Sequence, residues 1–239
     1  MYSILEHYLS TNHILMIGMI VTFILTFFLL EHPFSFLPSD QGRAFAVNGS
    51  LSKGKLRGVG FIFVLCFLIS SVLFLPLDVE YVIYGILLFA MMISGYLDDA
   101  SKTPWNEYKK GLIDLVISVV AVLTYMNFNS TTICFGADEI VIPKALFLIL
   151  GVILIWVSVN VTNCTDGVDG LCASLCSVTL LAFGVLFASV LQKYAMANFL
   201  FLSVLFAYLY FNSSPSSMLM GDAGSRALGF YIAVIALKS

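Results

Sequence analysis

The strongest constraint on how this chain can fold is a succession of long apolar runs with short polar segments between them. Spanning a bilayer as a helix takes about 17–25 mostly apolar residues. Seven runs approach that length, and an eighth begins near the end of the sequence. They lie at Ile14–Leu30, Val59–Leu75, Val82–Leu97, Leu112–Met126, Ala145–Val159, Leu171–Leu191, Ala195–Phe211 and Arg226–Leu237. Because the runs are apolar on all sides rather than alternating, they predict helices. We expect an all-α, polytopic membrane protein with about eight membrane helices in one transmembrane domain, residues 1–239.

The composition excludes the main soluble classes of protein. Of the 239 residues, 60% are hydrophobic and 10% are charged, and the formal net charge is −3. An average soluble domain is about 25% charged. This balance argues against a water-soluble globule, a disordered chain and a protein that binds nucleic acid through a basic surface. Membrane lipid is the expected surrounding, and no nucleic-acid partner is expected.

The distribution of Lys and Arg predicts an orientation in the membrane. The segments after the first, third, fifth and seventh runs hold eight of these residues, and the opposite side holds three. Cytoplasmic loops are enriched in Lys and Arg. We therefore expect the first set of loops in the cytoplasm and the N-terminus outside.

Two further expectations concern local structure. The eighth run has 12 residues, about 18 Å of helix against a hydrocarbon core of about 30 Å. This shortfall suggests that the protein continues beyond Ser239. Between the fourth and fifth runs, Thr131–Phe135 and Glu139–Ile142 are predicted to pair as a small hairpin around Gly136-Ala137-Asp138.

Acidic residues gather in three short motifs at the ends of runs. GYLDDASK contains Asp98 and Asp99, NVTNCTDGVDGL contains Asp166 and Asp169, and MLMGDAGSRALG contains Asp222. The motifs follow the third, fifth and seventh runs, so all three are expected at the same face. Carboxylates that meet at one face suit Mg²⁺, which prefers hard oxygen ligands.

Helix capping is the alternative reading of some of these acids. Asp166 or Asp169 could cap the following helix, and Asp222 could cap the last one. Capping does not account for Asp98 and Asp99, because they end a helix and the helix dipole disfavours acids there. Asp114 is a separate case, facing either the membrane interface or the interior of the bundle.

Glycines and lysines in the same loops complement the acids. Glycines let backbone N–H groups approach a ligand closely, and helix N-termini favour anions. Lys53, Lys102 and Lys109 or Lys110 add positive charge, although such residues also serve as the topology signal or contact lipid headgroups. Acids for Mg²⁺ together with lysines and free N–H groups indicate a diphosphate site.

The three motifs together resemble those of the polyprenyl-phosphate N-acetylhexosamine-1-phosphate transferases. GYLDDASK is similar to the DDxxK motif, NVTNCTDGVDGL to the N-x-x-N-x-x-DG-x-DGL loop, and MGDAGSRALG to MGD-x-GS-x-x-LG. The resemblance extends over about residues 35–235. Thr165 and Lys102 favour the phospho-N-acetylmuramoyl-pentapeptide transferase branch.

That resemblance implies a reaction and a setting. The reaction moves phospho-MurNAc-pentapeptide from UDP-MurNAc-pentapeptide to undecaprenyl phosphate and gives lipid I and UMP, with Mg²⁺ as cofactor. It is the first membrane step of peptidoglycan synthesis. The implied protein has ten helices, forms a homodimer in the bacterial cytoplasmic membrane and has its active site on the cytoplasmic face.

The resemblance also implies roles for individual residues. Asp98 would be a base or a nucleophile, Asp99 its partner and a helper in metal binding, and Asp222 a Mg²⁺ ligand. The substrate-binding set comprises Asn163 and Asp166 near the diphosphate and sugar, Asp169 near the uridine, Asn212 and Gly221 beside the nucleotide, Lys102 and Lys109 at the phosphates, and Lys53 toward the nucleobase.

The sequence departs from the family pattern in three places. The usual TPTMGG stretch reads Lys55–Gly60, and Arg226 stands where leucine is usual. The C-terminal loop with its histidine motif and about two helices are absent. Two other functions stay open: a sister enzyme that transfers GlcNAc-1-phosphate from UDP-GlcNAc to undecaprenyl phosphate, and, more distantly, a cation-coupled transporter.

Overall fold

The computed structural model describes residues 1–239 except 33, 41, 43–52, 102, 104 and 136–137. Its elements, in chain order, are α1 (Tyr2–Leu5), α2 (Thr11–Glu31), α3 (Gly60–Phe74), α4 (Val79–Asp99), α5 (Glu107–Phe128), β1 (Thr132–Phe135), β2 (Asp138–Val141), α6 (Lys144–Thr165), α7 (Leu171–Phe187), α8 (Gln192–Asn212) and α9 (Gly221–Lys238). Each of the eight apolar runs corresponds to one of the helices α2–α9.

The helices have the length and composition of membrane spans. Five helices among the described residues are long and apolar enough to cross a membrane, namely α2, α4, α5, α6 and α8. Helices α3 and α7 are apolar but shorter, with 15 and 17 residues. The chain is therefore a helical, multi-pass membrane protein, as its apolar runs predict.

The last helix is longer than its apolar run. Helix α9 begins at Gly221 instead of Arg226 and has 18 residues. The hydropathy pattern missed residues 221–225 because Asp222 and Ser225 are polar. The side chains of Asp222, Ser225 and Arg226 are nonetheless buried in the bundle, where neighbouring groups pair with them.

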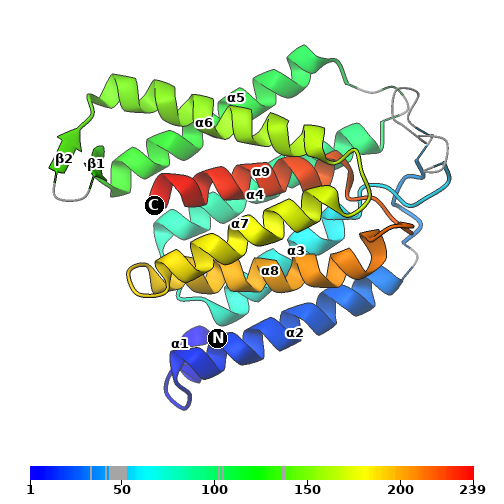
Figure 1. The fold of residues 1–239 in the computed structure, drawn as a ribbon, viewed down its shortest axis with the longest axis horizontal. Helices are drawn as coiled ribbons and strands as arrows, with labels where there is room; N and C mark the ends of the chain where they lie inside the picture. The colour runs from blue at the N-terminus through cyan, green and yellow to red at the C-terminus, as the bar shows by residue number, and fades with distance from the viewer. Residues whose placement is uncertain (33, 41, 43–52, 102, 104, 136–137) are drawn as a thin grey trace.

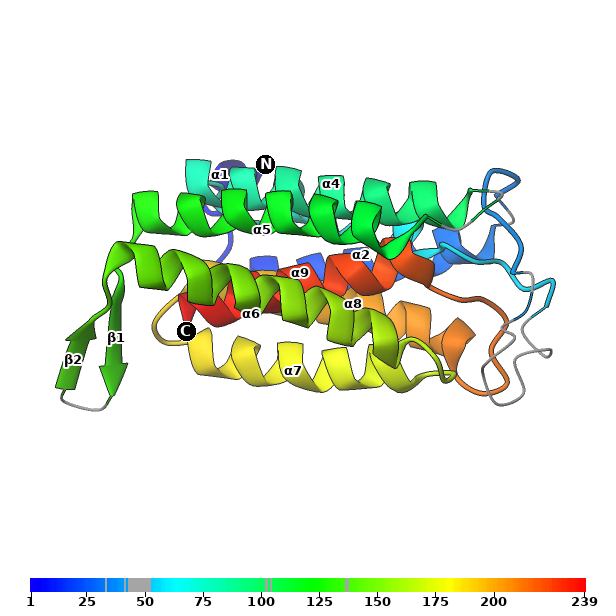
Figure 2. The same ribbon diagram turned by 90° about the horizontal axis from the view of Figure 1, so that it is seen from above.

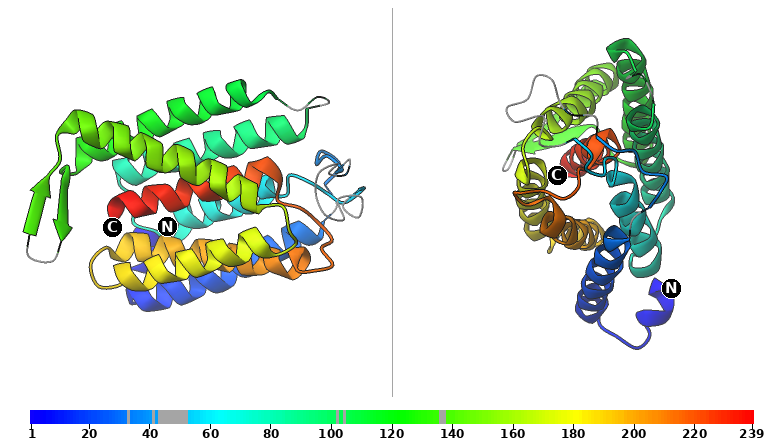
Figure 3. Two further views of the ribbon diagram at one scale, coloured as in Figure 1. Left: turned by 45° about the horizontal axis from the view of Figure 1, so that its top comes forward. Right: turned by 90° about the vertical axis from the view of Figure 1, so that its right-hand side faces the viewer.

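Helix α9 lies at the centre of the bundle. Figure 1 shows α6 above it, α7 and α8 below it and α4 crossing behind it, and the end-on view in Figure 3 shows it enclosed. Glycines allow its neighbours to approach closely. A Cβ atom at Gly95 of α4 would lie 2.4 Å from the carbonyl oxygen of Asp222, and one at Gly60 of α3 would lie 2.1 Å from the backbone nitrogen of Gly224.

The predicted hairpin is confirmed at one end of the bundle. Strands β1 and β2 pair antiparallel, with Thr132 opposite Val141. In Figure 2 the hairpin projects from one end of the helices, and the loops that carry the three acidic motifs lie at the other end. The fold is all-α apart from this hairpin in the described part of the chain.

Three loop segments are joined by backbone hydrogen bonds at the motif end. Arg57 N–H donates to Pro38 O over 2.8 Å, and Asp40 N–H donates to Lys55 O over 2.8 Å. Leu219 N–H donates to Leu56 O over 2.8 Å. This layer fixes Arg57 beside the first turn of α9.

Candidate functional site

The two adjacent acids of the first motif end helix α4 and point to different partners. Asp98 Oδ1 accepts a hydrogen bond from the Trp105 backbone N–H at 2.7 Å, and its Oδ2 lies 2.7 Å from Lys110 Nζ. Asp99 Oδ1 accepts from Arg57 Nε at 2.8 Å, and its Oδ2 accepts from the Ala223 N–H at 3.1 Å. Both carboxylates are buried. Each therefore depends on protein donors in place of water.

The third motif brings Asp222 to the same place from the first turn of α9. Its Oδ1 lies 3.3 Å from Arg57 Nη2, and its Oδ2 lies 3.3 Å from Lys110 Nζ. The preceding Gly221 has a φ of +66°, and a Cβ there would lie 2.3 Å from Asp99 Oδ2. Only glycine fits, because both the backbone angle and the space exclude a side chain.

Two cations alternate with these three carboxylates. Arg57 contacts Asp99 and Asp222 and also reaches Asp40, with 3.3 Å between Nη1 and Oδ1. Burial disfavours the charged guanidinium, but the nearby carboxylates outweigh that effect and raise the pKa of Arg57. Four carboxylates face two cations in this cluster, so it carries a formal excess of two negative charges.

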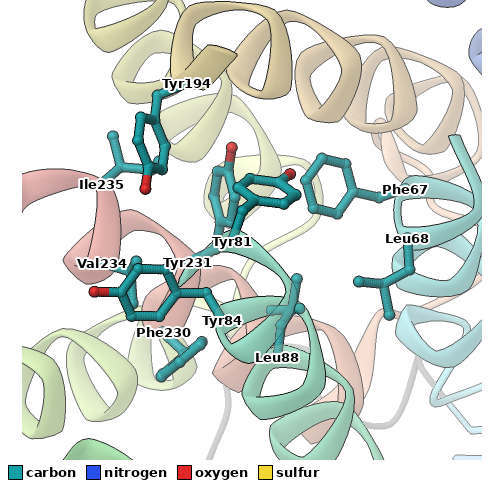
Figure 4. A pocket seen from close by; sticks show the side chains of 11 residues that line it. Phe67, Leu68, Tyr81, Tyr84, Leu88, Tyr194, Phe230, Tyr231, Val234 and Ile235 are labelled. Atoms are coloured by element: carbon teal, nitrogen blue, oxygen red, sulfur yellow. The ribbon is translucent and has the colours of Figure 1, made fainter. Parts of the chain in front are cut away.

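A cavity of about 410 Å³ opens onto this cluster. The residues that line it come from the loop before α3, the end of α4 and the start of α5: Pro38, Ser39, Asp40, Gly42, Arg57, Asp98, Asp99, Ala100, Ser101 and Lys110. A second cavity toward the opposite end of the helices differs in size and chemistry. It measures about 20 Å³ and is ringed by apolar and tyrosine side chains from α3, α4, α8 and α9, as Figure 4 shows. It has room for about one water. The cavity of about 410 Å³, which is lined by the charged cluster, is the candidate site for a polar substrate.

The second motif lies near the cluster and is joined to the loop before α9. Asp169 Oδ2 accepts from the Ser216 N–H at 3.0 Å and lies 3.8 Å from Lys55 Nζ. Asn212 Oδ1 accepts from the Gly170 N–H at 3.0 Å. These bonds connect the α6–α7 loop to the segment that follows α8.

The same motif also contacts α9 directly. Asn163 Oδ1 accepts from Ser225 Oγ at 2.8 Å, which places Asn163 against the helix that carries Asp222. Asp166 is half-buried at the C-terminal cap of α6.

Capping does not explain the motif acids. The N-cap of α7 is Gly170 and that of α9 is Met220, and neither makes a side-chain capping bond. Asp222 lies in the first turn of α9, and its carboxylate faces Arg57 and Lys110.

The lysines are arranged differently from the expectation that singled out Lys109. Lys109 is exposed, with its Nζ 3.3 Å from the centre of the Trp105 ring, whereas the neighbouring Lys110 contacts Asp98 and Asp222. Lys53 is exposed in a turn before Lys55. Lys102 lies outside the described residues.

Two residues of the cluster, Arg57 and Asp40, were not among those singled out from the sequence, and Lys110 was named there only as an alternative to Lys109. One signal pointed to Lys110, because it lies four residues before Asp114 and so on the same face of α5. Arg57 stood out only as a departure from the family pattern. Asp40 gave no signal, since its position depends on the loop layer.

Asp114 faces the interior of the bundle and not the membrane interface. It is 2% exposed, and its Oδ1 lies 2.5 Å from Nη2 of Arg226, which is also 2% exposed. Arg226 Nε and Nη1 are buried without a hydrogen-bond partner among the described residues. Together with Lys110 and Asp222, the pair forms two opposed ion pairs one helical turn apart between α5 and α9.

The carboxylates at the cavity meet part of what a divalent cation requires. Mg²⁺ usually takes one or two carboxylates and completes its shell with water and phosphate oxygens. Among the described residues no three His, Cys, Asp or Glu side chains are arranged as a ready metal site. Asp99 and Asp222 supply suitable hard oxygens on either side of Arg57. The chemistry fits Mg²⁺ provided that substrate oxygens complete the shell.

Comparison with known proteins agrees with the three motifs. The profile of glycosyl transferase family 4 matches residues 81–239. A phospho-N-acetylmuramoyl-pentapeptide-transferase from Treponema pallidum is 35% identical over 93% of this chain and 68% of its own length. The proteins of that name from Halalkalibacterium halodurans and Dictyoglomus turgidum are 29% and 26% identical, over 95% and 94% of this chain and 76% and 74% of their own lengths. The chain therefore belongs to the phospho-N-acetylmuramoyl-pentapeptide transferase family, within glycosyl transferase family 4.

Proposed function

We propose that the chain transfers phospho-MurNAc-pentapeptide from UDP-MurNAc-pentapeptide to undecaprenyl phosphate, giving lipid I and UMP. One observation carries the proposal. Asp98, Asp99 and Asp222, which come from motifs more than a hundred residues apart, meet Arg57 and Lys110 beside a cavity at one end of a membrane bundle. Carboxylates and cations in this arrangement suit a reaction between two phosphate groups at the membrane surface.

The residues of the cluster have distinct proposed roles. Asp98 faces the cavity and would accept the proton of the lipid phosphate or attack the donor itself. Lys110, which lies between Asp98 and Asp222, would stabilise negative charge that develops on the phosphates. Asp169, Asn163 and Asp166 would contact the donor from the α6–α7 loop.

Magnesium is the proposed cofactor. Asp222 and Asp99 would hold the ion together with diphosphate oxygens, and when bound it supplies charge neutralisation at the diphosphate. The formal excess of two negative charges in the cluster matches the charge of one divalent cation.

The proposed setting is the bacterial cytoplasmic membrane, with the motif end facing the cytoplasm. Lysine and arginine are concentrated in the loops of that end, as the positive-inside rule requires. A homodimer is proposed from the family resemblance alone.

The test is UMP release by the purified protein with undecaprenyl phosphate and Mg²⁺ in detergent. UDP-MurNAc-pentapeptide and UDP-GlcNAc are supplied separately, with Asp98→Asn and Asp222→Asn as controls. We expect turnover with UDP-MurNAc-pentapeptide only, and the loss of most activity in both variants. Turnover with UDP-GlcNAc alone would assign the chain to the sister reaction. No turnover with either donor would overturn the proposed transfer.

A further inference from the structure

Every carboxylate oxygen of the three motif acids at the cavity already accepts a hydrogen bond or ion pair from the protein. Two of these donors are backbone N–H groups, which serve Asp98 and Asp99. The other four contacts come from two side chains, Arg57 and Lys110. A metal ion at Asp99 and Asp222 would therefore have to compete mainly with Arg57, which contacts both.

The surroundings of Arg57 allow it to change partner without leaving the site. Its side chain is 29% exposed toward the cavity, whereas the side chain of Asp99 is fully buried. A guanidinium has five N–H donors. Three serve Asp40, Asp99 and Asp222, one on each nitrogen, and this leaves one further N–H on each of Nη1 and Nη2.

Asp40 provides an anchor that does not involve the motif acids. Its side chain is 1% exposed and lies 3.3 Å from Arg57 Nη1. It is held in place by the loop layer and by the Gly42 N–H, which donates to Oδ2 at 3.2 Å. The guanidinium could release Asp99 and Asp222 while it keeps this contact. Its two remaining donors match the paired oxygens of a phosphate.

We propose that Arg57 is a built-in competitor of the divalent cation, which it keeps from Asp99 and Asp222 until a diphosphate draws the guanidinium to itself. Metal and diphosphate then bind together, each favouring the other. The inference rests on the proposed Mg²⁺ site. It concerns Arg57 of this chain, which stands in one of the stretches that depart from the family pattern.

The experiment measures the binding of Mn²⁺ alone, as a spectroscopic substitute for Mg²⁺, by electron paramagnetic resonance on the full chain in detergent. The proteins are the wild type, Arg57→Gln, Arg57→Lys, Asp222→Asn and the matched control Lys55→Gln. Lys55→Gln also removes one positive charge, from the same loop, but Lys55 contacts Ser216 and Asp169. Folding of each variant is checked by size exclusion and thermal unfolding.

We expect Arg57→Gln to tighten Mn²⁺ binding by about tenfold or more, because one positive charge leaves the immediate shell of both ligands. Arg57→Lys should fall between, since lysine keeps the charge but lacks the planar fork with which Arg57 contacts Asp99 and Asp222 through separate nitrogens. Lys55→Gln should change the affinity by less than about threefold, and Asp222→Asn should weaken binding. Adding UDP, with a protein-free blank for the metal that UDP itself binds, should tighten Mn²⁺ binding more in the wild type than in Arg57→Gln.

The outcomes separate this inference from the proposal of a metal site. If Mn²⁺ binds and Asp222→Asn weakens it, but both Arg57 variants bind Mn²⁺ as the wild type does, the competitor role is overturned and the metal site stands. If no protein binds Mn²⁺ with or without UDP, the metal site fails and the role of Arg57 fails with it. If Arg57→Gln does not fold, Arg57→Lys carries the comparison.

Discussion

At the scale of single residues, adjacent positions in the chain have opposite environments. Lys109 and Lys110 are neighbours, but the helix turns them to different faces. One lies over the ring of Trp105, and the other reaches two buried carboxylates. The sequence shows two similar basic residues, so which of them reaches the cluster depended on which face of α5 is buried.

This contrast gives a matched test on neighbouring side chains. Lys110→Gln should lower the rate of UMP release by about 10²–10³-fold, since it removes a preorganised charge from the site. Lys109→Gln should reduce the rate far less, because that lysine is exposed. Steady-state kinetics with saturating donor measure both. A larger loss in Lys109→Gln would return the phosphate role to Lys109.

Gly221 offers a second test at this scale. In Gly221→Ala the new methyl group would meet Asp99 Oδ2, whereas at Gly54, with a φ of +89°, nothing lies within 4 Å of an added Cβ. Gly54→Ala should therefore lower the free energy of unfolding only by the cost of a left-handed backbone, about 1–2 kcal/mol. Gly221→Ala should lower it by about 1–3 kcal/mol more, because of steric overlap. Equilibrium unfolding in detergent measures both variants. Equal losses of unfolding free energy would show that the Asp99 side chain can move aside without measurable cost.

At the scale of elements, α5 and α9 are joined by ion pairs inside a low-dielectric bundle. The pairs Lys110–Asp222 and Asp114–Arg226 have opposite polarity and lie one turn apart. Breaking a buried pair is costly because the remaining charge has no partner, whereas replacing both members by apolar residues is often neutral. The Asp114–Arg226 pair is the more buried of the two. It therefore fixes the pairing of α5 with α9 more than it adds to stability.

A double-mutant cycle checks this interpretation. Arg226→Leu and Asp114→Leu should each lower the free energy of unfolding by about 3–5 kcal/mol. The double variant should lose much less than the sum of the two. Unfolding of all four proteins in the same detergent gives the coupling energy. Additive losses would mean that the two side chains do not depend on each other.

At the scale of the whole molecule, the bundle separates two ends with different chemistry. The acidic motifs, the cavity beside the charged cluster and the loop layer are at one end, and the β1–β2 hairpin is at the other (Figure 2). A nucleotide-linked donor reaches the site from water, and the lipid acceptor reaches it from the membrane. A site at the membrane surface is open to both.

The orientation can be measured with single cysteines at the two ends. Ser213 is exposed at the motif end and Ser189 at the hairpin end, and the five natural cysteines are first replaced by serine. In intact cells, a maleimide that crosses only the outer membrane should label Ser189→Cys. Ser213→Cys should react only after the cytoplasmic membrane is opened. The reverse pattern would place the motif end outside.

The sequence by itself determined the class of fold, the eight long helices and the face on which the acids gather. These follow from local properties, because a run of apolar residues in lipid must satisfy its backbone within one helix. Helix counting then places Asp98, Asp169 and Asp222 at the same end without any knowledge of packing. The hairpin also followed from local pattern.

Only the tertiary structure decided how charges pair across distant segments. Arg57 contacts Asp99 and Asp222, which lie 42 and 165 residues further along the chain, and Asp114 pairs with Arg226 at a separation of 112 residues. The first turn of α9 was missed for the same reason, since its polar side chains are stable only when partners from other helices surround them. In a low-dielectric interior the free energy of a charge depends on its nearest neighbours in space, and the order of residues along the chain does not specify those neighbours.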